Sequence, residues 1–135
     1  MNQNLSHRSS SPDADIPYLL VIDDDKMILD ILNEVLHSTR IRIINAHTGN
    51  EGLDLFKHFH DKIKLILLDL FLPDISGMEI YKIVTRISPD IKIIFMSGFP
   101  DQDILKLKDL PGNFDFIQKP FSMREIKSKV QKMIS

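Results

Sequence analysis

Five short apolar runs alternate with segments of helical period along most of this chain, and this alternation limits the folds that it can form. In the first helical segment Ile28, Ile31, Leu32, Val35 and Leu36 fall on one face at helical spacing. The five pairs, each an apolar run followed by a helical segment, are YLLVI with KMILDILNEVLHS, IRIINA with EGLDLFKHF, KLILLDL with MEIYKIVTRI, KIIFMS with QDILKLKDL, and FDFIQ with REIKSKVQKMI. The pattern predicts five strand–helix units.

The composition of the apolar runs predicts how the strands pair. Runs such as LILLDL and KIIFM are apolar on both faces, which is typical of a parallel sheet covered by helices on both sides. We therefore expect an α/β fold, a five-stranded parallel sheet with helices on both faces and right-handed crossovers. Three capping boxes mark expected helix starts, at Thr48/Glu51, Ser76/Glu79 and Ser122/Glu125.

The ends of the chain differ in character. Residues 1–17, MNQNLSHRSSSPDADIP, are rich in Ser, Asn, Asp and Pro, and they predict a flexible N-terminal leader. Residues 18–135 are then one domain, because 135 residues with 43% hydrophobic content suit a single core. The Met1 leader and the ending at a complete fifth helix favour a stand-alone chain.

Charge and hydropathy exclude several classes of function. The net charge of -2 carries no basic excess, so we expect no direct binding of nucleic acid. No apolar run approaches the roughly 20 residues of a membrane span, so we expect no membrane partner. The chain has no cysteine and its N-terminus lacks the apolar core of a signal peptide, which makes the cytoplasm the expected location.

Polar side chains follow four of the predicted strands at the edge where an open parallel sheet binds its ligands. Clustered carboxylates there favour a hard cation such as Mg2+, and a lysine and a hydroxyl beside it can hold a phosphoryl oxygen. The polar residues at these strand ends are Asp23, Asp24, Asp25, Asp69, Ser97 and Lys119.

Structural interpretations stay open for some of these residues. Consecutive Asp residues after a strand are also common as turn formers and helix N-caps. Ser97 belongs to an ordinary loop dipeptide, SG. Asp69 favours a function more strongly, because an uncompensated carboxylate at the end of KLILLD would be costly to bury.

The motifs VIDDD, LILLDLFLPDISGMEI, IIFMSG and FIQKPF, in this order and at this spacing, resemble the receiver domain of two-component response regulators. The resemblance extends from Tyr18 to the C-terminus and implies the flavodoxin-like (βα)5 architecture. It implies a phosphoacceptor signalling domain that takes a phosphoryl group from a histidine kinase or a histidine phosphotransfer protein. Such a domain switches its surface for a downstream protein target and catalyses only its own phosphorylation and slow dephosphorylation.

The resemblance also implies a role for each acidic residue. Asp69 is the expected phosphorylation site, and Mg2+ is the expected cofactor. Asp24 would ligate Mg2+ directly, Asp23 would act mainly through metal-bound water, and the backbone carbonyl of Phe71 would be a further ligand. Asp25 is then a turn or cap residue.

The remaining motif residues are implied to respond to phosphorylation. Ser97 would bond the phosphoryl group, and Lys119 would pair with Asp69 or with the phosphate. Phe116 lies at the position of the family's aromatic switch, although a plain core aromatic is an equal alternative. The family also implies a cis peptide bond between Lys119 and Pro120.

Other functions predict different residues. A metal-dependent phosphohydrolase that uses an aspartyl phosphate needs a second acid where Phe71 stands. A flavin or nucleotide carrier needs a Gly/Ser/Thr-rich loop where this chain has DDDK. A receiver-like interaction module that works without phosphorylation predicts gaps among the key residues. Finally, the apolar Phe71 and Phe99 predict slow loss of the phosphoryl group, unless both rings only pack against neighbouring loops.

Overall fold

The structure, a computed structural model, describes residues 16–37, 39–98 and 107–134. Within these residues the strands form one parallel sheet in the order β2-β1-β3-β4-β5. The expected α/β architecture is therefore confirmed, while most of the helix predicted at 102–110 lies outside the described residues. The elements are β1 Tyr18–Ile22, α1 Lys26–Leu36, β2 Arg42–Ala46, α2 Gly49–Phe59, β3 Ile63–Asp69, α3 Gly77–Ile87, β4 Lys92–Ser97, β5 Phe114–Gln118 and α5 Met123–Ile134.

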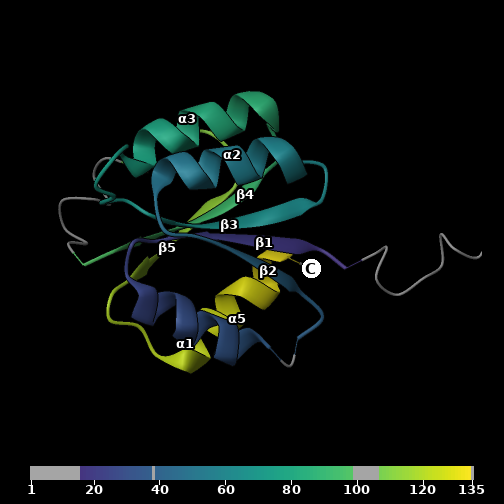
Figure 1. The fold of residues 1–135 in the computed structure, drawn as a ribbon, viewed down its shortest axis with the longest axis vertical. Helices are drawn as coiled ribbons and strands as arrows, with labels where there is room; N and C mark the ends of the chain where they lie inside the picture. The colour runs from purple at the N-terminus through teal and green to yellow at the C-terminus, as the bar shows by residue number, and fades with distance from the viewer. Residues whose placement is uncertain (1–15, 38, 99–106, 135) are drawn as a thin grey trace, which may run out of the picture.

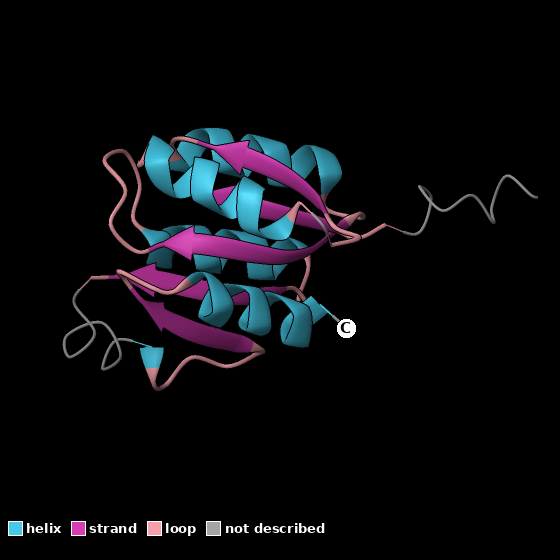
Figure 2. Cartoon of the chain, turned by 90° about the horizontal axis from the view of Figure 1, so that it is seen from below, coloured by secondary structure: helices cyan, strands magenta, loops and turns pink. Residues whose placement is uncertain are grey.

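Among the described residues, two helices cover each face of the sheet. Figure 1 shows α2 and α3 above the strands and α1 and α5 below them, and in the view from below in Figure 2 the strands lie side by side with helices in front of and behind them. Alternate residues of β1 point to opposite faces of the sheet. Leu20 and Ile22 pack in the hydrophobic core on one face, and Leu19 and Val21 pack in the core on the other. This two-sided burial is why the middle residues of the central strands are apolar on both faces of the sheet.

The strand order brings the first and third strands together at the centre of the sheet. The chain leaves β1 toward β2 on one side, and β3 returns on the other side of β1, so the strand order reverses there. Ile22 of β1 pairs with Leu68 of β3, which places the next residues, Asp23 and Asp69, side by side. Ligands of open parallel sheets bind at such a reversal point, outside the carboxyl ends of the strands.

The helix starts follow the predicted capping residues. Thr48, Ser76 and Ser122 each accept a hydrogen bond through the side-chain oxygen from the backbone N–H three residues later, at 3.0, 3.2 and 3.0 Å. These bonds satisfy N–H groups that have no partner within the helix. The second hydrogen bond of the capping box differs in α2. The side chain of Glu51 accepts from the N–H of His47 at 2.7 Å, and His47 precedes the N-cap residue Thr48.

The buried face of α1 is shifted from the predicted one. Leu29 is only 2% exposed and lies in the core with Leu32 and Leu36, whereas Ile31 is only partly buried. Helical spacing alone leaves the phase of the buried stripe open among neighbouring apolar residues, and the helix rests on the sheet along the Leu29 side.

Gly77 is required for close packing at the start of α3. A Cβ atom at Gly77 would lie 2.7 Å from the carbonyl oxygen of Asp69 and 2.9 Å from the Cα of Leu70. Its N–H also donates to the carbonyl of Leu70 at 3.3 Å. The residue that begins α3 therefore closes the loop that starts at Asp69. Across the described parts of the chain, none of the helices combines the length and hydrophobicity of a membrane span.

Candidate functional site

Three carboxylates meet where the ends of β1 and β3 lie together. Asp23 and Asp24 directly follow β1, and Asp69 is the last residue of β3. Each of them offers one oxygen, and these oxygens lie within 4.8 Å of one another. Asp23 is fully buried and Asp69 is 5% exposed, whereas Asp24 is exposed. The structure therefore brings the three predicted acids into one cluster that is open to solvent through Asp24.

Both carboxylate oxygens of Asp23 are engaged in hydrogen bonds. Oδ1 accepts from the N–H of Asp25 at 2.8 Å, and Oδ2 accepts from Nζ of Lys119 at 2.6 Å. The same ammonium lies 3.3 Å from Oδ2 of Asp69. Lys119 therefore bridges two buried acids and is closer to Asp23, whereas the sequence had suggested Asp69 or a phosphate as its partner.

Asp69 is held by one backbone group and one side chain. Its Oδ1 accepts from the N–H of Phe71 at 2.9 Å, and its Oδ2 faces Lys119. Burial raises the pKa of Asp69 to about 6, with a contribution from the charge of Asp23, against the opposing effects of the Phe71 N–H and Lys119. A carboxyl group of this kind is ionised above about pH 6 and is weakly solvated.

Lys119 keeps its charge although it is largely buried. Burial works against the ammonium form, but the hydrogen bond to Asp23 and the charges of Asp23 and Asp69 outweigh it, so the pKa of Lys119 lies above its ordinary value. The peptide bond from Lys119 to Pro120 is cis, as the resemblance implied. The site therefore holds one fixed cation beside its carboxylates.

Ser97 and Phe116 lie on the neighbouring strands. Ser97 ends β4 directly after Met96, which pairs with Asp69, and it is 1% exposed. Its carbonyl accepts from the N–H of Lys119 at 2.8 Å, which ties the ends of β4 and β5 together. Phe116 of β5 is partly buried against the core on the α2 and α3 face.

The third acid of the triplet has a local structural role. Asp25 is the N-cap of α1, because its side chain accepts from the N–H of Met27 at 2.9 Å. The prediction that Asp25 is a turn or cap residue is therefore confirmed. Asp24 instead lines a depression of about 530 Å³ together with Phe71 and Asp74.

These donors fit a Mg2+ ion. Mg2+ takes oxygen ligands and is commonly bound through one or two carboxylates while it keeps several waters. Asp24 and Asp69 supply such oxygens at the open side of the cluster. Asp23, which is fully buried and lies only 2.6 Å from Lys119, suits an indirect contact through water.

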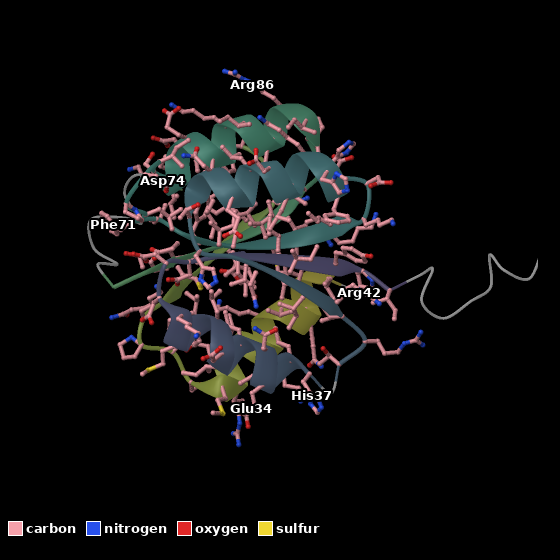
Figure 3. All side chains as sticks on the ribbon, in the orientation of Figure 1. Glu34, His37, Arg42, Phe71, Asp74 and Arg86 are labelled. Carbon is pink, nitrogen blue, oxygen red and sulfur yellow. The ribbon has the colours of Figure 1, made fainter. Side chains whose placement is uncertain are left out.

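The sequence interpretation missed a residue that joins this end of the molecule to α2. Asp74, in the loop after β3, accepts from the N–H groups of Gly49 and Asn50 at 2.9 and 2.8 Å. Figure 3 shows Asp74 and Phe71 at the same end of the molecule. Asp is common in turns, so the motif LPDISG alone carries no signal for a partner this distant along the chain.

Comparison with known proteins places the chain among signalling domains. A family model described as "Response regulator receiver domain" matches residues 19–131. The Bacillus subtilis "Uncharacterized transcriptional regulatory protein YcbL" is 34% identical over 85% of this chain. The match spans only 50% of the length of that protein. Sporulation initiation phosphotransferase F of the same organism is 29% identical over 86% of the chain and 92% of its own length. The crystal structure of a receiver domain protein from Clostridium thermocellum superposes with a TM-score of 0.77 at 27% identity, covering 87% of this chain and 94% of that one.

Proposed function

The chain belongs to the family of response regulator receiver domains and is a phosphoacceptor signalling domain, and we propose that Asp69 is the residue that accepts the phosphoryl group. One observation carries this assignment: Asp69 ends the central strand β3 inside a cluster of three acids, beside the ammonium of Lys119. The other two acids suit different tasks, because the side chain of Asp23 is fully buried and holds Lys119 at 2.6 Å, while Asp24 is exposed. Asp69 is buried, but its side chain keeps 8% exposure, whereas the side chain of Asp23 has none.

The proposed donor is a phosphorylated histidine of a histidine kinase or of a histidine phosphotransfer protein. An oxygen of the ionised Asp69 carboxylate attacks phosphorus and forms a new O–P bond. The P–N bond to the donor imidazole breaks, and the imidazole nitrogen keeps the electron pair and takes up a proton. Such a transfer depends mainly on positioning and on electrostatic stabilisation.

Receiver domains bind Mg2+ at an acidic pocket, and we propose that Asp24, Asp69 and the carbonyl of Phe71 hold it here, with Asp23 acting through water. Bound Mg2+ supplies neutralisation of the charge on the phosphoryl oxygens. The protein holds the acceptor in place, since the Phe71 N–H and Lys119 fix the two oxygens of Asp69. Lys119 remains charged and can contact an oxygen of the new phosphoryl group.

Phosphorylation is proposed to change the surface of the domain through Ser97 and Phe116. The Ser97 hydroxyl would turn to donate to a phosphoryl oxygen, and Phe116 would move into the space that this shift leaves. Phe116 has no hydroxyl group, so its switching would be steric. The change is a shift between two populations, whose size depends on the differential contacts of the phosphorylated and unphosphorylated states.

The catalytic activity proposed for the chain is limited to its own phosphorylation and slow dephosphorylation. A phosphohydrolase would need an acid at Phe71, and this position instead carries a ring that is 49% exposed. A downstream protein target and a cytoplasmic location belong to the same proposal. So does a division of the chain into a leader at 1–17 and a domain at 18–135.

Incubation with a small phosphodonor and Mg2+, followed by intact-mass measurement, tests this function. The wild type should gain one phosphoryl mass only when Mg2+ is present, and Asp69→Asn should gain none. Asp54→Asn, which changes an exposed acid on α2, is the matched control and should react as the wild type does. Labelling of Asp69→Asn at the wild-type rate would overturn the proposal.

A further inference from the structure

Asp74 caps a helix to which it does not belong. It lies in the loop between β3 and α3, yet Oδ1 accepts from the N–H of Gly49 and Oδ2 accepts from the N–H of Asn50, the first two residues of α2. Thr48 already caps the same helix through the N–H of Glu51. Asp74 therefore satisfies the two N–H groups of the first turn that the local cap does not reach.

The start of α2 also approaches this loop very closely. A Cβ atom on Gly49 would lie 2.1 Å from Cγ2 of Ile75, 3.0 Å from Cδ1 of Ile80 and 3.2 Å from Oδ1 of Asp74. Only glycine lets the first residue of the helix touch the loop in this way. The hydrogen bonds and the packing are two independent observations of one contact, which we call the Asp74 clamp.

The charge of Asp74 suits its position. The N–H groups of Asn50 and Gly49 lower the pKa of Asp74, so the carboxylate remains ionised at a more acidic pH than an ordinary Asp does. The N-terminus of a helix carries a partial positive charge that favours an anion. The clamp is therefore a pair of charge-assisted hydrogen bonds, in which each carboxylate oxygen accepts from one backbone N–H.

The clamped loop is the one that carries the proposed metal ligand. It begins at Asp69, whose Oδ1 accepts from the N–H of Phe71, and it closes where Gly77 donates to the carbonyl of Leu70. Asp74 adds an anchor between these two ends and ties the loop to a different element. A backbone carbonyl can serve as a preformed ligand only if its loop is held before the metal binds.

We propose that Asp74 is a positioning residue for the phosphorylation of Asp69. Through the Asp74 clamp, the first turn of α2 holds the loop so that the carbonyl of Phe71 faces the acidic cluster before Mg2+ arrives. The inference rests on the proposed function, because it assigns a task to the carbonyl of Phe71 in that function. In this role Asp74 acts through the loop, because its two oxygens accept hydrogen bonds from the first residues of α2.

Three variants separate this role from simple capping. Asp74→Ala removes the clamp, Asp74→Asn keeps one acceptor oxygen, and Asp54→Ala removes an exposed acid from α2 without touching the loop. Mg2+ affinity is measured by calorimetry on each folded protein. Amide hydrogen exchange is followed in the metal-free protein, so that it does not depend on the metal or on phosphorylation.

We expect Asp74→Ala to weaken Mg2+ binding roughly tenfold, at the lower end of the losses seen when residues that orient metal ligands are removed. Exchange should rise at the loop amides from 71 to 76, apart from Pro73, which has no N–H, as well as at Gly49 and Asn50. Asp74→Asn should give an intermediate Mg2+ affinity, since one of the two bonds can form, and Asp54→Ala should match the wild type.

Two results would overturn the inference, and they can be told apart. If Asp74→Ala exposes only the amides of Gly49 and Asn50 and leaves Mg2+ affinity unchanged, Asp74 is merely a helix cap and the proposed function stands. If the wild type itself binds no Mg2+, the proposed function fails and takes the inference with it. Asp74→Asn is the milder variant that keeps the test valid if Asp74→Ala unfolds.

Discussion

Asp69→Asn should stabilise the metal-free protein at alkaline pH, although it removes the residue on which the function depends. The pKa of Asp69 is raised from 3.8 to about 6, chiefly by burial, so the folded state disfavours the ionised carboxylate. A difference of about 2 units corresponds to about 3 kcal/mol at full strength. The site is open toward Asp24 and solvent screens part of this effect, so we expect a gain of about 1–2 kcal/mol.

The gain should depend on pH in a defined direction. Above the folded pKa of about 6 the wild type bears the full cost of a buried charge. As the pH falls from about 6 toward 3.8, Asp69 becomes protonated in the folded state and the cost disappears. Asparagine does not titrate, and its oxygen can still accept from the N–H of Phe71. The difference between the variant and the wild type should therefore shrink as the solution is acidified.

Urea unfolding in the presence of a chelator, at about pH 8 and about pH 4, measures both free energies of unfolding. Asp54→Asn on the surface of α2 serves as the control and should change stability little at either pH. With Mg2+ added at the higher pH, the free energy of unfolding of the wild type should rise relative to that of Asp69→Asn, because only the intact site gains stability from the ion. A variant that is less stable than the wild type at about pH 8, or equally stabilised at both pH values, would refute the reasoning.

Other changes in the site have distinct expected results. Asp24→Ala should lose most of its Mg2+ affinity in a thermal titration, whereas Asp25→Ala should keep it and lose about 1 kcal/mol of stability as the N-cap of α1 is removed. Equal losses of affinity would contradict this division. Lys119→Met should lower the free energy of unfolding by about 3 kcal/mol, because Asp23 stays buried without its cation. Adding Asp23→Asn should restore much of that loss, and a purely additive double variant would argue against the pairing. Phe71→Asn should speed loss of the phosphoryl mass roughly tenfold, equal to about 1.4 kcal/mol of barrier, by offering water a hydrogen bond. Unchanged decay with intact Mg2+ binding would favour a ring that only packs.

The sequence predicts a long-lived phosphorylated state from Phe71 and Phe99 together. Phe99 lies outside the described residues. The exposed ring of Phe71 leaves its side chain within reach of solvent at the edge of the site. The lifetime of the phosphorylated state therefore stays a prediction.

The fold could be predicted because the pattern of apolar residues along the sequence reflects which residues the fold buries. Strand residues that are covered on both faces of the sheet must be apolar, and the β3 residues Leu65–Leu68 are all fully buried. The phase of α1 could not be predicted in the same way. Leu29 and Ile31 are both apolar, and only packing on the sheet decides that Leu29 is the buried one.

The candidate site was predictable as a set of residues but not as a set of contacts. Strand ends on one edge of a parallel sheet must meet, which is why Asp23, Asp69 and Lys119 could be grouped from the sequence. Which acid Lys119 approaches more closely depends on side-chain geometry, and it is Asp23. The Asp74 clamp joins residues that are 25 positions apart in the chain, so no local sequence pattern predicts it.

Chemical mapping of the phosphorylated residue tests the central claim most directly. The wild type is phosphorylated with a small phosphodonor and Mg2+ and is then reduced with borohydride, which converts an aspartyl phosphate into homoserine. Tandem mass spectrometry of the peptides locates the homoserine. The account predicts homoserine at position 69 alone and none when Mg2+ is omitted. Homoserine at Asp23, Asp24 or Asp25, or an unreduced phosphate on a hydroxyl side chain such as Ser97, would contradict it.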